Sequence, residues 1–268
     1  MIEFDTMGDA REFLIERQVS KLLYESIDGW DKWLKRAGGG LSMTDLPVDW
    51  PVVREGFARR NLIVHADGIV NHLYLGSLKG VQGPLKGGHQ VGDKLNVDEE
   101  YLSGFLQEIS ALGRMLAVSV GLKLRKNDRL SFFRSLNSDT YRSLTSGHWR
   151  TTITLSQYAM TCDLPRAFRV EAQTRGWVAR RELFGVDSIK SEVESWDVSG
   201  LAEELAHRKS VLLGSADSID RVRNVIKSEK LTPFDVAVDP LYAHIRSEFL
   251  GISSPTDESL GRGSPELS

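Results

Sequence analysis

The stretch "NVDEEYLSGFLQEISALGRMLAVSVGLKLR", residues 96–125, decides the fold class. Its apolar residues recur at helical spacing: Leu102, Phe105, Leu106, Ile109, Leu112 and Leu116. Residues three and four apart lie on the same face of a helix, so this pattern predicts a long amphipathic helix. Asn96 and Glu99 have the spacing of a capping box and predict where that helix begins.

Two more helices are predicted before this stretch. Residues 9–36 show helical periodicity, and the glycines at 38–40 end the predicted helix. A second helix is predicted from near Val52 to about His65, with Asp49 as its cap and Pro51 in its first turn. The glycine-rich segment that follows lacks the Gly-Lys-Ser/Thr pattern of a phosphate-binding loop, so we expect a flexible loop there.

The C-terminal half also reads as helices and no segment predicts strands, so we expect an all-α protein. We divide it into an N-terminal helical domain (1–126), a linker or bridging segment (127–145), a helical hairpin region (146–250) and a disordered tail (251–268). The hairpin region weakly resembles tetratricopeptide-type helix pairs. The tail is rich in Ser, Pro and Gly, which predicts disorder.

Charge is unevenly distributed along the chain, although the net charge is only -3. Residues 114–181 hold 13 Lys and Arg against 4 Asp and Glu, whereas residues 182–268 hold 9 against 16. The basic segment could present a surface that attracts phosphates, or its charges could belong to solvated helix faces.

Composition and patterning exclude several classes of protein. Cys162 is the only cysteine, which excludes an internal disulfide and a cysteine-rich metal site. His65, Asp67 and His72 lack the spacing of a known metal motif, so we expect no metal and no cofactor. The N-terminus lacks a signal-peptide pattern, and no window offers 18 uninterrupted apolar residues. We therefore expect a cytoplasmic protein that does not enter a membrane.

The helix predicted over 52–65 carries an unusual charge. Projected at about 100° per residue with Val53 at zero, Arg60 falls at about -20° and Val64 at about +20°, inside an apolar arc. Three polar residues fall at the edges of this arc: Arg59, Asn61 and His65. An unpaired buried charge is costly, so Arg60 must be paired, sit at a seam between proteins, or face an anionic ligand.

The sequence "RNLIVH", residues 60–65, resembles the signature of HEPN domains, in which an arginine is followed a few residues later by a histidine. The surrounding "FARRNLIVHADGIVNHLYL" and "VGDKLNVDEEYLSGFLQEISALG" look like HEPN domains of the abortive-infection type. The resemblance covers about residues 10–125. It implies an antiparallel helical bundle that dimerises through the motif helix and forms one composite cleft.

The resemblance implies a metal-independent endoribonuclease in which a ribose 2′-hydroxyl attacks the adjacent phosphodiester. His65 would act as general base or acid, and Arg60 would bind the charged phosphate oxygens. Asn61 would hold the imidazole or a phosphate oxygen, and Arg54 and Arg59 would contact RNA. Arg60 and His65 diverge by about 140° on an ideal helix, so a second copy of the chain could supply converging groups.

The implied biological role is that of a toxin or antiphage-defence effector of the abortive-infection kind. The C-terminal region would then bind an antitoxin or a trigger partner. Two alternatives stay open. The chain could be a non-catalytic HEPN-like module for dimerisation or ligand binding, or an unrelated helical scaffold in which the Arg and His cap helix carbonyls.

Overall fold

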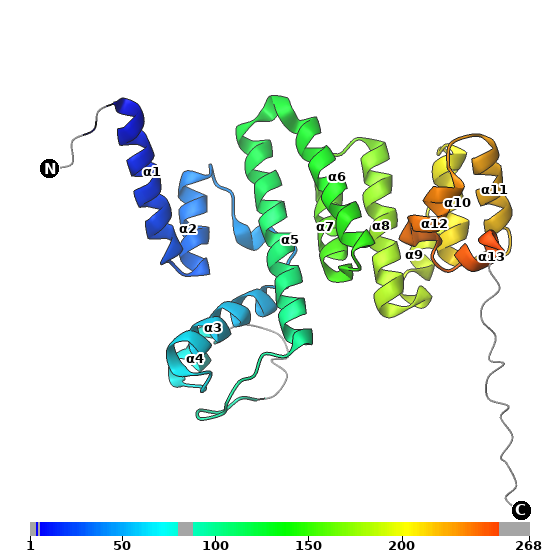
Figure 1. Cartoon of the computed structure of the whole chain (residues 1–268). Coiled ribbons are helices and arrows are strands. Elements are labelled where there is room, and N and C mark those ends of the chain that lie inside the picture. Colours follow the sequence, from blue (N-terminus) through cyan, green and yellow to red (C-terminus); the bar gives the residue numbers. More distant parts are fainter. Residues whose placement is uncertain (1–3, 5, 80–87, 252–268) are drawn as a thin grey trace, which may run out of the picture. The chain divides into compact units, whose positions relative to one another are not determined.

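The computed structural model describes residues 4, 6–79 and 88–251. Within these residues the chain forms helices α1 to α13 joined by loops and short 3₁₀ turns, and it contains no strand (Figure 1). Pairing of extended backbone is confined, in the same residues, to one bridge between Ile69 and Lys94. The all-α prediction is therefore confirmed.

The chain divides into two compact units. Unit 1 comprises Met1–Asp139 and Gln157–Leu164, and unit 2 comprises Thr140–Ser156 and Pro165–Ser268. The tail that we expected to be disordered lies, beyond Gly251, outside the described residues.

The stretch expected to be a linker or bridging segment, 127–145, is mostly helix. It contains the end of a 3₁₀ turn and then α6 (Arg129–Thr145). The first part of α6 belongs to unit 1 and its last part to unit 2. The polar composition of this stretch suggested a linker, but its residues Phe133 and Leu136 are buried in unit 1.

Two helices, α1 (Met7–Leu23) and α2 (Ile27–Ala37), occur where one helix was predicted over 9–36. The break follows Tyr24, and the Ser26 hydroxyl accepts a hydrogen bond from the Gly29 amide at 3.2 Å. A serine in this position satisfies a free amide of a new helix, so it begins α2 rather than continuing α1. The helical periodicity of the apolar residues continues across the break. The sequence pattern therefore did not reveal that the helix is interrupted.

The next helices of unit 1 begin with acidic caps. The helix α3 (Trp50–Ala66) starts after Asp49, whose carboxylate accepts a hydrogen bond from the Val52 amide, as predicted. The helix α5 (Glu99–Leu124) is capped by Asp98, whose carboxylate accepts from the Tyr101 amide at 2.7 Å. The predicted capping box on Asn96 was therefore wrong by two residues.

The helices α3 and α5 approach closely at Gly56. A Cβ atom at this position would lie 2.1 Å from Cε2 of Phe105, so only glycine fits the observed backbone. The Phe57 ring packs edge-to-face on Trp30 of α2 and on Phe105 of α5, with centroids 5.8 and 6.0 Å apart. Aromatic contacts thus join α2, α3 and α5.

A small core lies under α4 (His72–Ser77) at the far end of α3. Its buried members are Leu62, Val70, Tyr74, Leu78 and Leu95. Backbone hydrogen bonds hold the chain on both sides of the glycine-rich segment, from the Val70 amide to the Asp93 carbonyl and from the Leu95 amide to the Gly68 carbonyl. Residues 80–87 of that segment are outside the described part.

Unit 2 is built from helices around its own core. The helices that lie wholly in it are α8 (Arg166–Phe184), α9 (Lys190–Ser195), α10 (Glu203–Leu213), α11 (Ser218–Lys227), α12 (Pro233–Val238) and α13 (Arg246–Leu250). The longest of these, α8, has 19 residues. The helix α7 (Trp149–Thr161) is divided between the units. The core of unit 2 includes Trp177, Val211 and Val222, and α10 and α11 form a hairpin around Gly214.

Within the described residues, α5 is the one helix that is long and apolar enough to cross a membrane by length and composition. It also carries Glu108, which is buried and accepts a hydrogen bond from the Asp49 amide. Ala111, Leu112 and Met115 of α5 lie in the core of unit 1. These residues make α5 part of the core of unit 1.

Candidate functional site

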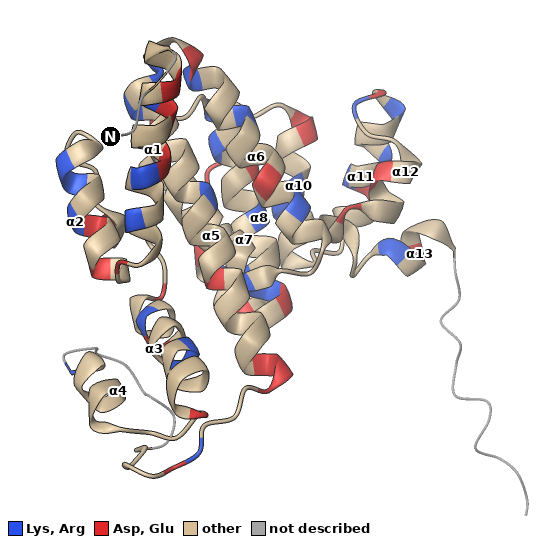
Figure 2. Cartoon of the chain, turned by 60° about the vertical axis from the view of Figure 1, so that its left-hand side comes forward, with Lys and Arg blue, Asp and Glu red and all other residues tan. Residues whose placement is uncertain are grey.

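The candidate site lies on the second half of α3, near the end of the helix. The helix ends at Ala66, and the next residue, Asp67, caps it in the left-handed conformation with a φ of 50°. Figure 2 shows blue Lys and Arg bands on α3. The three arginines of this helix are Arg54, Arg59 and Arg60.

The buried face of α3 changes along its length. Val53 and Gly56 are buried in the first half, whereas Leu62 is buried in the second half, about 180° from Val53 on an ideal helix. The first half packs on α5, and Leu62 joins the core under α4. A single helical projection assumes that the same face is covered along the whole helix. In α3 the covered face differs between the first and the second half.

Arg60 is therefore exposed, and in this half of α3 no element of the described chain covers the apolar arc on which it was expected to lie. Its neighbours on that arc are open as well, since Ile63 is 42% and Val64 56% exposed. Water solvates the guanidinium of Arg60, so within one chain the residue needs no buried partner. What stands out instead is an exposed apolar surface beside an exposed arginine.

Arg60, Asn61 and His65 are all exposed on this part of α3. The Arg60 guanidinium donates a hydrogen bond from Nη1 to Oδ1 of Asn61 at 3.0 Å. The asparagine therefore orients the arginine rather than the histidine. Among the described residues, no hydrogen bond or ion pair orients the His65 ring. The imidazole stands in the last turn of α3.

A buried carboxylate, Glu55, organises the inner face of α3. Its side chain accepts hydrogen bonds from the Tyr74 hydroxyl at 2.7 Å, the Tyr101 hydroxyl at 2.6 Å and Arg59 Nε at 2.6 Å. Burial and the hydrogen bond to Glu55 raise the pKa of both tyrosines above the ordinary value, so both phenols stay protonated. The cluster Glu55–Arg59–Tyr74–Tyr101 ties α3 to α4 and α5.

Arg59, which we expected to contact RNA, is held inside this cluster. Its guanidinium stacks on the Tyr101 ring, 3.9 Å from the centroid, and Nη1 donates to the Asn96 carbonyl at 3.0 Å. Sequence reasoning missed Glu55, although its spacing of four residues from Arg59 is that of a helical ion pair. The geometry gives Arg59 a structural role.

Arg54, the second expected RNA contact, reaches toward α2. It donates from Nη2 to Asp28 at 3.1 Å, and both side chains are partly exposed. Exposed ion pairs of this kind contribute at most about 1 kcal/mol, so a phosphate could replace Asp28 at small cost.

Several cations of the basic segment 114–181 are neutralised within their own unit. In unit 2, Arg175 binds Glu171 at 2.9 Å, Arg180 binds Glu192 at 2.7 Å and Arg181 contacts Glu182 at 3.3 Å. These ion pairs within unit 2 neutralise part of the positive charge of the segment.

The part of the chain that the structure describes contains no group of three or more His, Cys, Asp or Glu side chains able to hold a metal ion. The site thus consists of an exposed arginine and asparagine that contact each other, a nearby exposed histidine, and apolar neighbours. Comparison of this chain with known protein families, curated proteins and solved structures found no match.

Proposed function

We propose that the protein is a metal-independent endoribonuclease of HEPN type, with Arg60, Asn61 and His65 as its catalytic residues. The observation that carries the proposal is the exposure of these three residues on one helix, with the Arg60 guanidinium fixed by Asn61. The three residues carry the groups needed for attack of a 2′-hydroxyl on a phosphodiester. Imidazole takes and returns protons near neutral pH, and guanidinium stabilises the charge that develops on phosphate.

The active form in this proposal is a homodimer that pairs through α3. Ile63 and Val64 next to Arg60 are exposed apolar side chains, and a two-fold partner would cover them. Arg60 and His65 diverge on one helix, so the same pairing would bring the arginine of one protomer toward the histidine of its partner. The phosphate of RNA would then lie between the two helices, with Arg54 at the periphery.

The proposed cellular role is that of a cytoplasmic toxin or antiphage-defence effector. Unit 2 would supply the surface for an antitoxin or trigger partner. This assignment rests on the resemblance of residues 10–125 to abortive-infection HEPN domains.

One observation favours a second function, a non-catalytic HEPN-like module for dimerisation or ligand binding. A general base is usually held by a further hydrogen bond, and no described residue holds the His65 ring. In that function the exposed face of α3 would serve only to pair two protomers.

The test is cleavage of total RNA by the purified protein in EDTA. Wild type should cleave, while Arg60→Ala and His65→Ala should each lose at least about a hundredfold in rate, as expected for loss of an acid–base or charge-stabilising group. His72→Ala is the matched control, because His72 is also an exposed histidine in the same unit and should leave the rate unchanged. Equal cleavage by wild type and His65→Ala would refute the catalytic assignment.

A further inference from the structure

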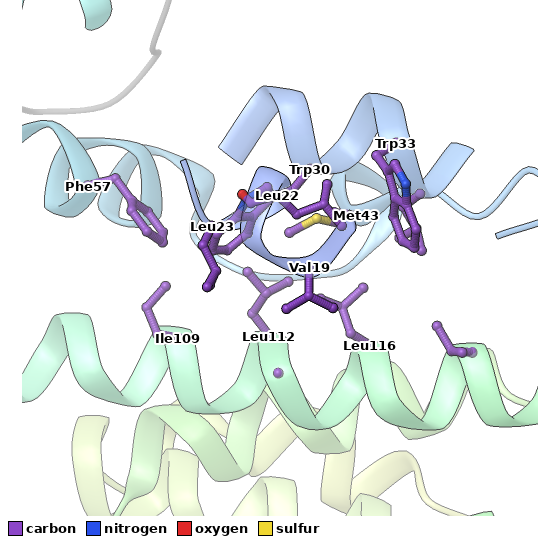
Figure 3. Close-up of a pocket in the computed structure, with 13 residues that line it drawn as sticks. Val19, Leu22, Leu23, Trp30, Trp33, Met43, Phe57, Ile109, Leu112 and Leu116 are labelled. Carbon is purple, nitrogen blue, oxygen red and sulfur yellow. The ribbon is translucent and has the colours of Figure 1, made fainter. Parts of the chain in front are cut away.

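Unit 1 contains an apolar pocket of about 370 Å³ that the proposed function does not use (Figure 3). Figure 3 shows Leu22 of α1 and Leu112 and Leu116 of α5 reaching into it, with Trp33 of α2 on the other side. Its volume lies in the range of about 300–1,000 Å³ that is usual for sites of small molecules.

The helix α1 is incompletely packed against this pocket. It has no buried residue, although Val19 and Leu23 line the pocket; they are 49% and 71% exposed. Apolar side chains around an unfilled space lose dispersion contacts and stay in contact with water. A ligand with an apolar body would bury these side chains and attach α1 to α5.

A second hollow of about 220 Å³ adjoins the first and shares Leu22 and Trp33 with it. Its charged lining consists of Lys21, Lys32 and Arg36 against the single carboxylate of Glu25. Within the described ranges, none of these four side chains forms an ion pair. This hollow therefore attracts an anion beside a space that takes an apolar group.

We propose that unit 1 binds a free long-chain carboxylate, with its alkyl chain in the apolar pocket and its carboxylate facing Lys21, Lys32 and Arg36. The volume of the pocket, about 370 Å³, is near the lower end of the range for sites of small molecules, which suits a single alkyl chain such as that of dodecanoate. A helix of a second copy does not fit, because one helical turn about 10 Å wide fills a comparable volume by itself. The proposal is independent of the proposed function.

The pocket can be blocked at Gly113, which lines it on α5. A Cβ atom at this position meets nothing within 4 Å, so Gly113→Leu extends into the open space without clashing. Gly104→Leu is the matched control, because Gly104 lies on the same helix with equally open surroundings but does not line the pocket. Circular dichroism of both variants checks that the fold is kept.

The first measurement is quenching of tryptophan fluorescence by 12-bromododecanoate below its micelle concentration. Wild type and Gly104→Leu should show saturable quenching, which Trp30→Phe/Trp33→Phe should largely abolish because these two rings line the pocket. Gly113→Leu should bind at least about tenfold more weakly. Binding by Gly113→Leu that equals wild type would overturn the proposal.

The second measurement identifies the charge of the ligand by calorimetry. Wild type should bind dodecanoate about tenfold more tightly than dodecanol or dodecyltrimethylammonium. Lys32→Glu/Arg36→Glu changes two exposed side chains and should remove this preference while dodecanol still binds. Equal affinity of wild type for the carboxylate and the ammonium would overturn the proposal, as would quenching that requires phosphatidylglycerol vesicles.

Discussion

Glu55 is the residue on which the local structure of α3 depends most. Its side chain and that of Arg59 are only 6% and 13% exposed, and both form further polar contacts. Removing one partner of a buried pair leaves the other charge without compensation. We expect Glu55→Gln to lower the free energy of unfolding by about 3 kcal/mol, measured by urea denaturation.

The double variant Glu55→Gln/Arg59→Met separates this pairing from simple loss of packing. When both charged groups are absent, the uncompensated guanidinium is absent too. The double variant should therefore be more stable than the sum of the two single effects predicts, by at least about 1 kcal/mol. If the effects of the two single variants on the free energy of unfolding add up to that of the double variant, Glu55 and Arg59 are not coupled.

His207 in unit 2 predicts a dependence of stability on pH. It is 1% exposed; its Nδ1 lies 3.0 Å from the Glu203 carbonyl and its Nε2 lies 2.8 Å from the Tyr242 hydroxyl. The carbonyl accepts only, so Nδ1 carries the proton and Nε2 accepts from Tyr242. Burial lowers the pKa of His207 below its ordinary value of 6.5, and the neighbouring Arg208 lowers it further.

The unfolded chain therefore binds a proton at His207 more readily than the folded chain does. Below about pH 6.5 the free energy of unfolding should fall as the pH decreases, by up to about 1.4 kcal/mol per pH unit. Above about pH 6.5 the contribution of His207 to the free energy of unfolding is constant. Urea denaturation between pH 5 and 8 measures the slope. His207→Gln should reduce the slope, and the remainder belongs to His244, whose pKa burial lowers to about 4. An unchanged slope in His207→Gln would contradict a contribution from His207.

Arg60 shows how far single residues could be placed from the sequence. Its polar neighbours and its position on the helix followed from 3.6-residue periodicity. Its exposure did not follow, because exposure depends on which elements pack against each half of α3. The hydrogen bond from Arg60 to Asn61 depends on rotamers, which the sequence does not specify.

At the scale of elements, the contact between α3 and α5 at Gly56 is tight. Gly56→Ala places a Cβ atom against the Phe105 ring and should lower the free energy of unfolding by about 1–3 kcal/mol. Gly113→Ala on α5 is the control, because it gains helix propensity of up to about 1 kcal/mol in open space. Chemical denaturation should give opposite signs for the two variants; a stabilising Gly56→Ala would contradict the packing.

Helix existence was predictable, whereas helix ends were less so. The Asp49 cap of α3 was predicted because its side chain, the following proline and the apolar run agree. The break between α1 and α2 was not predicted, since Ser26 competes with a periodic pattern that runs past it. The pocket could not be predicted at all, because it reflects how closely α1 approaches α5.

The whole molecule consists of two units, each with its own core, and the all-helical class followed from periodicity over most of the chain. The boundary between units did not follow from composition, since it passes through α6 and α7 instead of a polar linker. The proposed dimer depends on contacts between two copies of the chain, which the periodicity within one chain does not specify. Its support is the exposed apolar surface beside Arg60 and the divergence of Arg60 from His65.

The most direct test of the proposed composite site mixes two inactive proteins. Light scattering should first show that wild type, Arg60→Ala and His65→Ala each have twice the chain mass. When the two variants exchange protomers, mixed dimers regain one complete site, and RNA cleavage in EDTA should return to about a quarter of the wild-type rate. A mixture as inactive as its separate components, in the presence of an active wild type, would contradict a site shared between two protomers.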